Sequence, residues 1–332
     1  MRWLLLRRRF QWCLAPILIA MVSVFATAQA QEYPARPIVM VVPFQAGGPT
    51  DVLARIVAQE LARTLGQPVQ IENVVGASGT IGAARVARAA PDGYTLMFHH
   101  IGLASADTVY KQLPYNTRTA FAPIGLVSKA PMVLIARADF PPDTMPILAS
   151  FGSAQRAWIT MGHGGVGTAS HLCALLFQSL IGAQFISVGY RGNGGLLHDV
   201  LGGHVDLACE TANVVSSAVR AERVKAYVMT GANRLSSLPR LATATETSYG
   251  SLDIRLWHGL YAPAGTPPNI VRNLNSALRA ALQSQELRQR FAGVNVQPVP
   301  EDQVTPQALG VKLIQEIDRW APLLKAARQP LD

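Results

Sequence analysis

The sequence predicts an α/β protein of two lobes, each a mostly parallel β-sheet flanked by helices. Apolar strand-like segments alternate with amphipathic helices from residue 38 to residue 326. One construction, a strand followed by a glycine-rich loop and a helix, occurs twice, more than a hundred residues apart. About 300 residues remain after an N-terminal leader, which exceeds one typical domain and suits two.

The first strand–loop–helix unit carries the most informative stretch of the chain, Val-Val-Pro-Phe-Gln-Ala-Gly-Gly-Pro-Thr-Asp at residues 41–51. An apolar strand is predicted over residues 38–42, and a helix over residues 50–65. Pro49 suits the first helical position, where no N–H donor is needed, and Gly66 ends the helix. Its apolar face recurs at helical spacing: Val52, Leu53, Ile56, Val57 and Leu61.

The start of this helix has the properties of an anion receptor. Its first backbone N–H groups have no partner within the helix, and the helix dipole places partial positive charge there. The preceding glycines allow a ligand to approach the main chain closely. Asp51, in the first turn, is expected to interact with this dipole rather than to act as a general base.

The second unit repeats the first. A strand is predicted over residues 158–161, a glycine-rich loop over residues 162–168 and a helix over residues 170–182, with Thr168 or Ser170 as N-cap. The apolar face of this helix consists of Leu172, Leu175, Leu176 and Leu180. Two anion-receiving helix starts in separate halves of the chain predict one ligand held between two lobes.

The remaining elements complete the α/β pattern. Further strands are predicted at residues 69–73, 94–98, 185–189, 205–209 and 224–230, and further helices at residues 79–89, 194–202, 269–283 and 305–326. Segments near residues 133–136 and 252–257 are predicted to be the hinge strands. This gives four parts: a leader at 1–30, lobe 1 at 31–133, lobe 2 at 134–254, and a return to lobe 1 at 255–332.

The N-terminus indicates export. Four arginines (Arg2, Arg7, Arg8 and Arg9) precede an apolar run, and Ala28-Gln29-Ala30 offers a cleavage site before Gln31. The run is shorter than the roughly 20 residues of a membrane span. The arginine stretch resembles a twin-arginine signal, but an ordinary cleavable signal peptide explains the same residues.

Removal of the leader changes the charge and the cysteine count. The whole chain has 29 basic and 20 acidic residues, and loss of the four leader arginines leaves 25 and 20, a net charge of +5. This mild excess suits anions, but no Lys/Arg cluster with aromatic residues indicates nucleic acid. Cys173 and Cys209 remain. An oxidising compartment permits a disulfide between them, but packing as two small apolar residues is the prediction.

Enzyme motifs are incomplete. Gly162-x-Gly164-x-x-Gly167 has the spacing of a dinucleotide fingerprint, but the acidic residue expected about 20 residues later is missing. Ser170 and His171 are neighbours on a helix and point about 100° apart, so they form no catalytic pair. His99 and His100 alternate faces on a strand, so they cannot share a metal. No catalytic residue, metal site or cofactor is predicted.

Motifs along nearly the whole mature chain resemble one family. They include Val42-Pro-Phe-x-Ala-Gly-Gly48 with Thr50-Asp51, Ala90-Pro-Asp-Gly-Tyr-Thr-Leu96, Gly164-x-x-Gly-Thr-x-Ser-His-Leu172, Tyr190-Arg-Gly192, Leu201-Gly-Gly-His-Val-Asp-Leu207 and Trp257-x-Gly-Leu-x-Ala-Pro-Ala-Gly-Thr-Pro267. Each motif is weak by itself, but their order and spacing together are specific. The chain resembles the Bug family, the periplasmic receptors of tripartite tricarboxylate transporters.

The resemblance implies a periplasmic-binding-protein fold, type II-like, whose lobes close on a small carboxylate. Family members hold one carboxylate through main-chain groups of two loops, which match residues 44–51 and 162–171 here. We expect the donors at Ala46 to Gly48 and Gly164 to Thr168, with Phe44 and Tyr190 as walls and His100, His163 and Glu210 tuning selection. The expected ligand-binding residues are Phe44, Ala46, Gly47, Gly48, Thr50, Asp51, His100, Gly162, His163, Gly164, Gly165, Gly167, Thr168, His171, Tyr190, Glu210 and Thr211.

The sequence therefore favours a monomeric, non-enzymatic periplasmic receptor for a small carboxylate, such as a di- or tricarboxylate, an aromatic acid or an amino acid. Its expected partners are the membrane subunits of a tripartite tricarboxylate-type transporter. Two alternatives stay open: an exported enzyme that acts on a small acid in the same cleft, and a ligand-sensing receptor for a sensor kinase.

Overall fold

The computed structural model describes residues 33–154 and 158–327, so the predicted signal peptide at residues 1–30 lies outside the described residues. The chain divides into two units, residues 1–35 and 36–332. Of the first unit only residues 33–35 are described, and the Tyr33–Pro34 peptide bond is cis. The second unit contains the α/β fold.

The elements of this unit follow the alternation predicted from the sequence. The strands are β1 (Ile38–Val42), β2 (Val69–Asn73), β3 (Thr95–His100), β4 (Phe121–Arg137), β5 (Thr160–His163), β6 (Ile186–Gly189), β7 (Leu207–Thr211), β8 (Val224–Met229), β9 (Arg255–Pro263) and β10 (Gln297–Pro298). The helices are α2 (Pro49–Leu65), α3 (Thr80–Ala87), α4 (Ala106–Val109), α5 (Met145–Ala154), α6 (Ala169–Ile181), α7 (Asn193–Leu201), α8 (Ala212–Arg220), α9 (Pro268–Gln283), α10 (Gln285–Gly293) and α11 (Pro306–Ala326). Short 3₁₀ turns are η2 (Ala77–Gly79), η3 (Ile101–Ser105), η4 (Ala244–Glu246) and η5 (Glu301–Gln303).

One curled sheet runs through both halves, with the strand order β2-β1-β3-β9-β4-β7-β5-β6, and β8 and β10 also pair with β4. The pairs β1–β2, β1–β3, β5–β6 and β5–β7 are parallel, as predicted. The strands that cross between the halves add antiparallel pairs, because β4 and β9 run against their neighbours.

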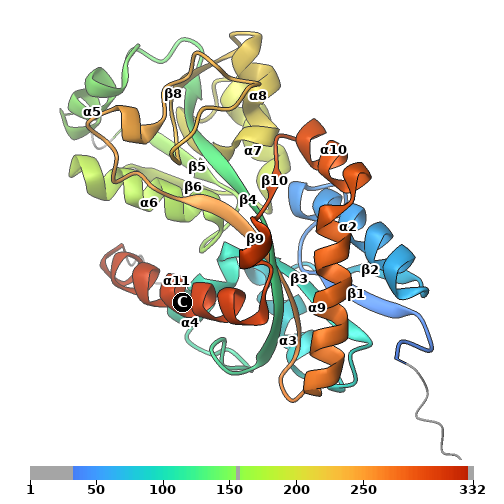
Figure 1. The fold of residues 1–332 in the computed structure, drawn as a ribbon. Coiled ribbons are helices and arrows are strands. Elements are labelled where there is room, and N and C mark those ends of the chain that lie inside the picture. The colour runs from blue at the N-terminus through green and yellow to red at the C-terminus, as the bar shows by residue number, and fades with distance from the viewer. Residues whose placement is uncertain (1–32, 155–157, 328–332) are drawn as a thin grey trace, which may run out of the picture. The chain divides into compact units, whose positions relative to one another are not determined.

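The long strand β4 joins the two halves (Figure 1). Its residues up to Pro131 pair with β9, and its residues from Met132 onward pair with β7 and β8. We use lobe 1 for the half that contains β1, β2, β3 and β9, and lobe 2 for the half that contains β5 to β8. From the sequence, only the end of β4, near residues 133–136, was located. The exact boundaries of the two lobes stay a prediction.

The residues of α2 define both ends of this helix and the face that it buries. Pro49 stands at its start, and its C-cap Gly66 adopts the left-handed conformation with φ 68°. Leu53, Val57 and Leu61 are buried with at most 1% exposure. Burial of each such side chain contributes about 1.5–3 kcal/mol, so this apolar face fixes the helix on the sheet.

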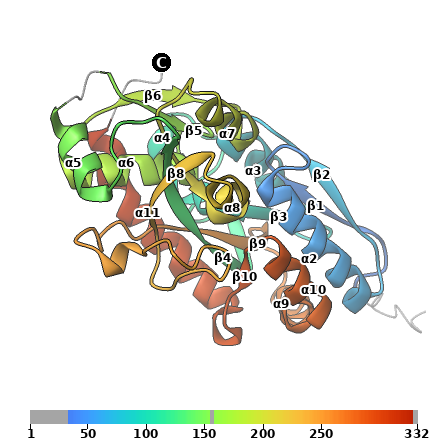
Figure 2. The ribbon, with the colours of Figure 1, turned by 90° about the horizontal axis from the view of Figure 1, so that it is seen from above.

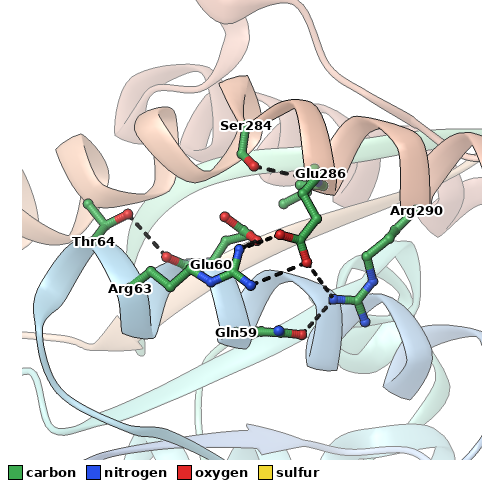
Figure 3. Close-up of polar contacts among 8 residues, drawn as sticks. Gln59, Glu60, Arg63, Thr64, Ser284, Glu286 and Arg290 are labelled. Carbon is green, nitrogen blue, oxygen red and sulfur yellow. Dashed lines mark hydrogen bonds and ion pairs between the residues drawn. The ribbon is translucent and has the colours of Figure 1, made fainter.

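On its outer side α2 lies against α9 and α10 (Figures 1 and 2). Arg63 donates to Glu60 at 2.7 Å and to Glu286 at 2.5 Å, and Arg290 donates to Gln59 at 2.6 Å, as Figure 3 shows. Exposed pairs of this kind contribute little to stability, because water and salt screen them. They therefore align α2 with α10, while apolar burial supplies the stability.

Cys173 on α6 and Cys209 on β7 form a disulfide, with Cα atoms 6.0 Å apart. The expectation of separate apolar packing was therefore wrong. Both residues are fully buried, which agrees with their apolar environment, but α6 packs on β7 with the two side chains facing each other. The disulfide links α6, the helix that follows the second glycine-rich loop, to the sheet of lobe 2.

Candidate functional site

A cavity of about 1640 Å³ lies between the two lobes and is lined from both. It exceeds the roughly 300–1,000 Å³ of typical ligand pockets, as expected of a cleft whose lobes can still approach each other. The expected ligand-binding residues that line it are Phe44, Ala46, Gly47, Gly48, Thr50, His100, Gly164, Gly165, Thr168, Tyr190 and Thr211.

Six expected residues do not line the cavity: Asp51, Gly162, His163, Gly167, His171 and Glu210. Four of them, Asp51, His163, His171 and Glu210, have side chains with hydrogen bonds behind the two loops. Gly162 is in β5, where a Cβ would lie 2.2 Å from Leu196 Cδ1, and the carbonyl of Gly167 accepts a hydrogen bond from Ser105 of lobe 1. These positions shape the loops.

The first loop is organised by Asp51. Its carboxylate accepts from the Gly47 N–H at 2.8 Å, the Arg55 side chain at 2.8 Å and the Asn73 amide at 2.8 Å. Burial alone would raise the pKa of Asp51, but these three donors hold it below its ordinary value. Asp51 thus caps the loop, in agreement with a role at the helix dipole.

This cap changes which main-chain donors are available. The Gly47 N–H is taken by Asp51, and the Gly48 N–H donates to the Gln45 carbonyl at 3.1 Å. Within the described residues the N–H of Thr50 has no acceptor, and Thr50 lines the cavity. Among the same residues the N–H of Ala46, which also lines the cavity, has no acceptor, so the available donors are Ala46, before the two glycines, and Thr50, in the first turn of α2.

The second loop is internally bonded in the same way. The N–H groups of Gly164, Gly165, Gly167 and Thr168 donate to Ser170, His163, His171 and the Gly165 carbonyl, respectively, at 2.9–3.2 Å. Among the described residues, the N–H groups of Val166 and Ala169 have no acceptor, and both residues line the cavity. Thr168 is the N-cap of α6 by position, but its hydroxyl donates to Gly165.

Two neutral histidines hold this second loop. His163 Nδ1 accepts from Gly165, and His171 Nδ1 accepts from Gly167, so neither nitrogen carries a proton. Their rings lie 4.4 Å apart. Burial lowers the pKa of His163, and burial together with the neighbouring His163 lowers the pKa of His171 to about 3.

In lobe 1, His100 lines the cavity and stacks on Phe44 with ring centroids 4.1 Å apart, whereas His99 lies behind it at 1% exposure. This is the alternation expected of neighbours on a strand. His258 on β9 was not anticipated as part of the site. It is fully buried, with Nε2 3.3 Å from the Thr50 hydroxyl and Nδ1 3.0 Å from the Ser128 hydroxyl, so it connects the start of α2 to the crossing strands.

Glu210 is fully buried and binds the side-chain amide of Asn193 through both carboxylate oxygens, at 2.6 and 2.8 Å. Asn193 in turn lies against Gly164, because a Cβ on that glycine would come 1.8 Å from Asn193 Oδ1. Glu210 thus supports the second loop from the side away from the cavity. Its position at the end of a strand had instead suggested direct contact with the ligand. Burial raises the pKa of Glu210 to about 7.

The position of Glu210 gives a testable result. A raised pKa means that the folded state resists ionisation, so the stability associated with the neutral acid falls as the pH rises from 4.5 to about 7. Glu210→Gln keeps an acceptor for Asn193 and removes this ionisation. We expect it to raise the free energy of unfolding at pH 8 by about 1–3 kcal/mol, without changing the order of ligand affinities. Urea denaturation at pH 5 and pH 8 measures this, and a loss of stability at pH 8 would contradict it.

Several polar residues outside the expected set also line the cavity, among them Lys111, Arg191 and Asn213. Arg191 lies within the Tyr190-Arg-Gly192 motif and could have been found there, whereas Lys111 and Asn213 stand in no motif. In the part of the chain that the structure describes, no group of three or more His, Cys, Asp or Glu residues is arranged to hold a metal ion. Within that same part, every helix is too short or too polar to cross a membrane.

The family model described as the tripartite tricarboxylate transporter family receptor matches residues 53–328. The structure of the periplasmic binding protein BugD is similar at a TM-score of 0.81 and 39% identity, over 89% of this chain and 98% of that one. MatC from Rhodopseudomonas palustris with bound malate gives a TM-score of 0.82 and 36% identity, over 88% and 100%. R. palustris Rpa4515 with adipate gives 0.81 and 29%, over 89% and 98%.

Three findings agree. The family model matches most of the chain, solved binding proteins are similar along nearly their whole length, and a cavity lies between the two lobes. Of the motifs that suggested the family from the sequence, those at residues 42–51, 164–172 and 190–192 contribute most of their residues to the lining of this cavity. The chain belongs to the tripartite tricarboxylate transporter receptor family, the Bug-type periplasmic solute-binding proteins.

Proposed function

We propose that this protein captures a small carboxylate between its two lobes in the periplasm and delivers it to the membrane subunits of a tripartite tricarboxylate-type transporter. One observation carries the proposal. The starts of α2 and α6, from different lobes, meet one cavity, and each has an N–H group, of Thr50 and of Ala169, with no acceptor among the described residues. Helix N-termini of this kind bind anions.

The proposed carboxylate seat differs from the one expected from the sequence. The ligand carboxylate accepts from the N–H groups of Thr50, Val166 and Ala169, while the glycines provide the close approach. Phe44, stacked on His100, and Tyr190, whose hydroxyl donates to Asp199 at 2.5 Å, form the walls. Malate and adipate in the similar structures are carboxylates of suitable size, which supports this ligand class.

The proposal includes a receptor without catalytic turnover. The three histidines closest to the loops, His100, His163 and His171, use Nδ1 to accept main-chain N–H groups, and burial keeps them neutral. They are therefore structural acceptors. The two alternatives, an exported enzyme and a receptor that signals to a sensor kinase, differ from the proposal in turnover and in the membrane partner.

Ligand binding should stabilise the folded state. A ligand at 100 times its dissociation constant adds about 2.7 kcal/mol. A thermal-shift screen of mono-, di- and tricarboxylates, amino acids, aromatic acids and neutral sugars is expected to give one cluster of acids that raises Tm. Mass spectrometry of the mixture after incubation should recover each acid unchanged. A rise in Tm with sugars and with no acid would contradict the proposed ligand class, and chemical conversion of an acid would favour the enzyme.

The proposed location requires removal of residues 1–30. The charged start, the apolar run and the Ala28-Gln29-Ala30 site predict a mature N-terminus at Gln31. Intact-mass measurement on protein from the periplasmic fraction should match residues 31–332, and size-exclusion chromatography with light scattering should give a monomer. Recovery of the uncleaved chain from the membrane fraction would contradict this expectation.

A further inference from the structure

We propose that Ser105 is a positioning residue that joins the two lobes and fixes how the two helix starts face each other. This inference rests on the proposed function, which supplies the ligand seat, and it assigns a role to a residue outside the cavity. Ser105 is the last residue of η3 in lobe 1, is 2% exposed and is not among the residues that line the cavity. Its hydroxyl donates to the carbonyl of Gly167, in the second loop, at 2.7 Å.

The hydroxyl of Ser105 has a second acceptor within its own lobe. The Gly102 carbonyl oxygen lies 2.8 Å from Ser105 Oγ, and a serine hydroxyl carries one proton, so the carbonyls of Gly102 and Gly167 share it. When the lobes move apart, the proton stays with Gly102 and no buried hydroxyl loses its partner. The contact with lobe 2 can therefore break and form again at a low cost in free energy.

Glycines on both sides let the main chains of the two lobes approach each other. A Cβ on Gly167, whose φ is 82°, would lie 2.5 Å from Ser105 Oγ and 3.2 Å from Val109 Cγ2. A Cβ on Gly102 would lie 3.4 Å from the Gly167 carbonyl oxygen and 2.7 Å from His100 Cε1. Helix α11 packs on η3 and α4 of lobe 1 and also on α6 of lobe 2, so helix packing supports the same joint (Figure 1).

The contact determines the orientation of a donor in the second loop. The Gly167 carbonyl and the Thr168 N–H belong to one planar peptide unit, and the Thr168 N–H donates to the Gly165 carbonyl at 3.2 Å. The Gly165 carbonyl in turn shares a peptide unit with the Val166 N–H, which points in the opposite direction. Val166 lines the cavity. Ser105 therefore acts on the ligand seat through the loop, without touching the ligand.

In lobe 1, η3 is connected to the first loop. The Gly102 N–H donates to His100 Nδ1 at 2.9 Å, and the His100 ring stacks on Phe44 with ring centroids 4.1 Å apart. Phe44 belongs to the loop that leads into α2. The Ser105 contact thus lies between the first loop and the second, and a shift of the lobes at this contact changes the separation of the two helix starts.

Ser105→Ala removes the donor and leaves a side chain that fits the same space. Isothermal titration calorimetry with malate, adipate and butyrate is expected to show a similar loss of affinity for each acid, about two- to tenfold, because the variant changes the placement of the loops and no group that touches the ligand. Thr266→Val is the matched control. The Thr266 hydroxyl is also buried and donates to a carbonyl three residues earlier, that of Pro263 at 2.8 Å, but Thr266 does not line the cavity, so affinity should stay unchanged.

A double-mutant cycle separates this role from a general effect on folding. Gly167→Ala places a methyl group against Ser105 Oγ, so it should weaken the binding of every acid more than Ser105→Ala does. In the Ser105→Ala/Gly167→Ala protein the 2.5 Å contact is gone, and this protein is expected to bind at least as tightly as Gly167→Ala alone. Additive losses would show that the two residues act independently and would overturn the inference.

The separation of the lobes is measured with spin labels on Arg88→Cys in lobe 1 and Arg220→Cys in lobe 2, both at exposed positions. Without added acid, pulsed electron spin resonance should give a broader distance distribution for Ser105→Ala than for the labelled protein that retains Ser105, and no change for Thr266→Val. An unchanged distribution or an unchanged affinity in Ser105→Ala would overturn the inference and leave the proposed function intact. Failure of the unmutated protein to bind any of the three acids would count against the proposed function, while the distances would still decide the inference.

Discussion

Gly164→Ala is expected to weaken the binding of every carboxylate by more than a hundredfold. A Cβ at this position would lie 1.8 Å from Asn193 Oδ1 and 2.8 Å from its Cγ. Asn193 is not free to withdraw, because both oxygens of the fully buried Glu210 hold its amide. The loop must therefore shift, and the N–H groups of Val166 and Ala169 shift with it. Calorimetry with the tightest acid measures the loss.

Two further variants make this result specific. Gly165→Val acts without Asn193, because Gly165 has a φ of 125° and a Cβ there would lie 3.0 Å from Ser78 of lobe 1, so it should also weaken all ligands alike. Gly293→Ala, at the end of α10 with nothing within 4 Å, is the control and should bind normally. Full-strength binding by a correctly folded Gly164→Ala protein would show that the second loop does not seat the carboxylate.

Acid is expected to destabilise this protein progressively as the pH falls below 6.5. Burial lowers the pKa of His99 from 6.5 to about 4, and lowers the pKa of His258 and of His171 to about 3. The unfolded chain binds these protons more readily, so the stability present above pH 6.5 is lost as the pH falls toward these lower values. A shift from 6.5 to about 4 corresponds to about 3 kcal/mol for one histidine.

Glu210 acts in the opposite direction, since its raised pKa makes the protein more stable as the pH falls from about 7 to 4.5. The effect of one glutamate on the free energy of unfolding is about 3 kcal/mol, and three or more histidines that each contribute a similar amount outweigh it. The summed effect of the histidines is comparable with a typical total stability of about 5–15 kcal/mol. The net effect is therefore acid destabilisation between pH 6.5 and pH 4.

Urea denaturation at pH 7.5, 6.5, 5.5 and 4.5 measures this dependence. His258→Asn removes one titrating group and should reduce the slope of stability against pH below 6.5 by about one proton, or about 1.4 kcal/mol per pH unit. The slope is informative even where the variant is less stable overall. A wild-type stability that is constant from pH 7.5 to 4.5 would contradict the buried histidine network.

The sequence predicted the elements whose ends carry local markers. The strand at residues 38–42 and the helix that ends at Gly66 were located within one residue, because an apolar run, Pro49 and a left-handed glycine define them. Helix α8 was missed, since it starts directly after the fully buried strand β7 with no turn residue between them. Strand β4 was recognised only at its end, because Pro123 and Pro131 interrupt the strand-like pattern of its sequence. In the structure both prolines lie within the pairing of β4 with β9.

The candidate site was predictable as two loops but not as a set of contacts. Glycine spacing identified both loops, and eleven of the seventeen expected residues line the cavity. The internal partners of the loop donors were not predictable, because Asp51 and Asn73, or Glu210 and Asn193, meet only after distant strands pair. The same holds for the disulfide between Cys173 and Cys209, which depends on α6 packing on β7.

The central claim is that two helix starts from different lobes seat one carboxylate. A crystal structure of the protein with the tightest-binding acid from the thermal-shift screen tests it most directly. The proposal predicts one carboxylate of the ligand within about 3 Å of the N–H groups of both Thr50 and Ala169. A ligand that lies in the cavity and is held by side chains alone, with no contact to either helix start, would contradict it.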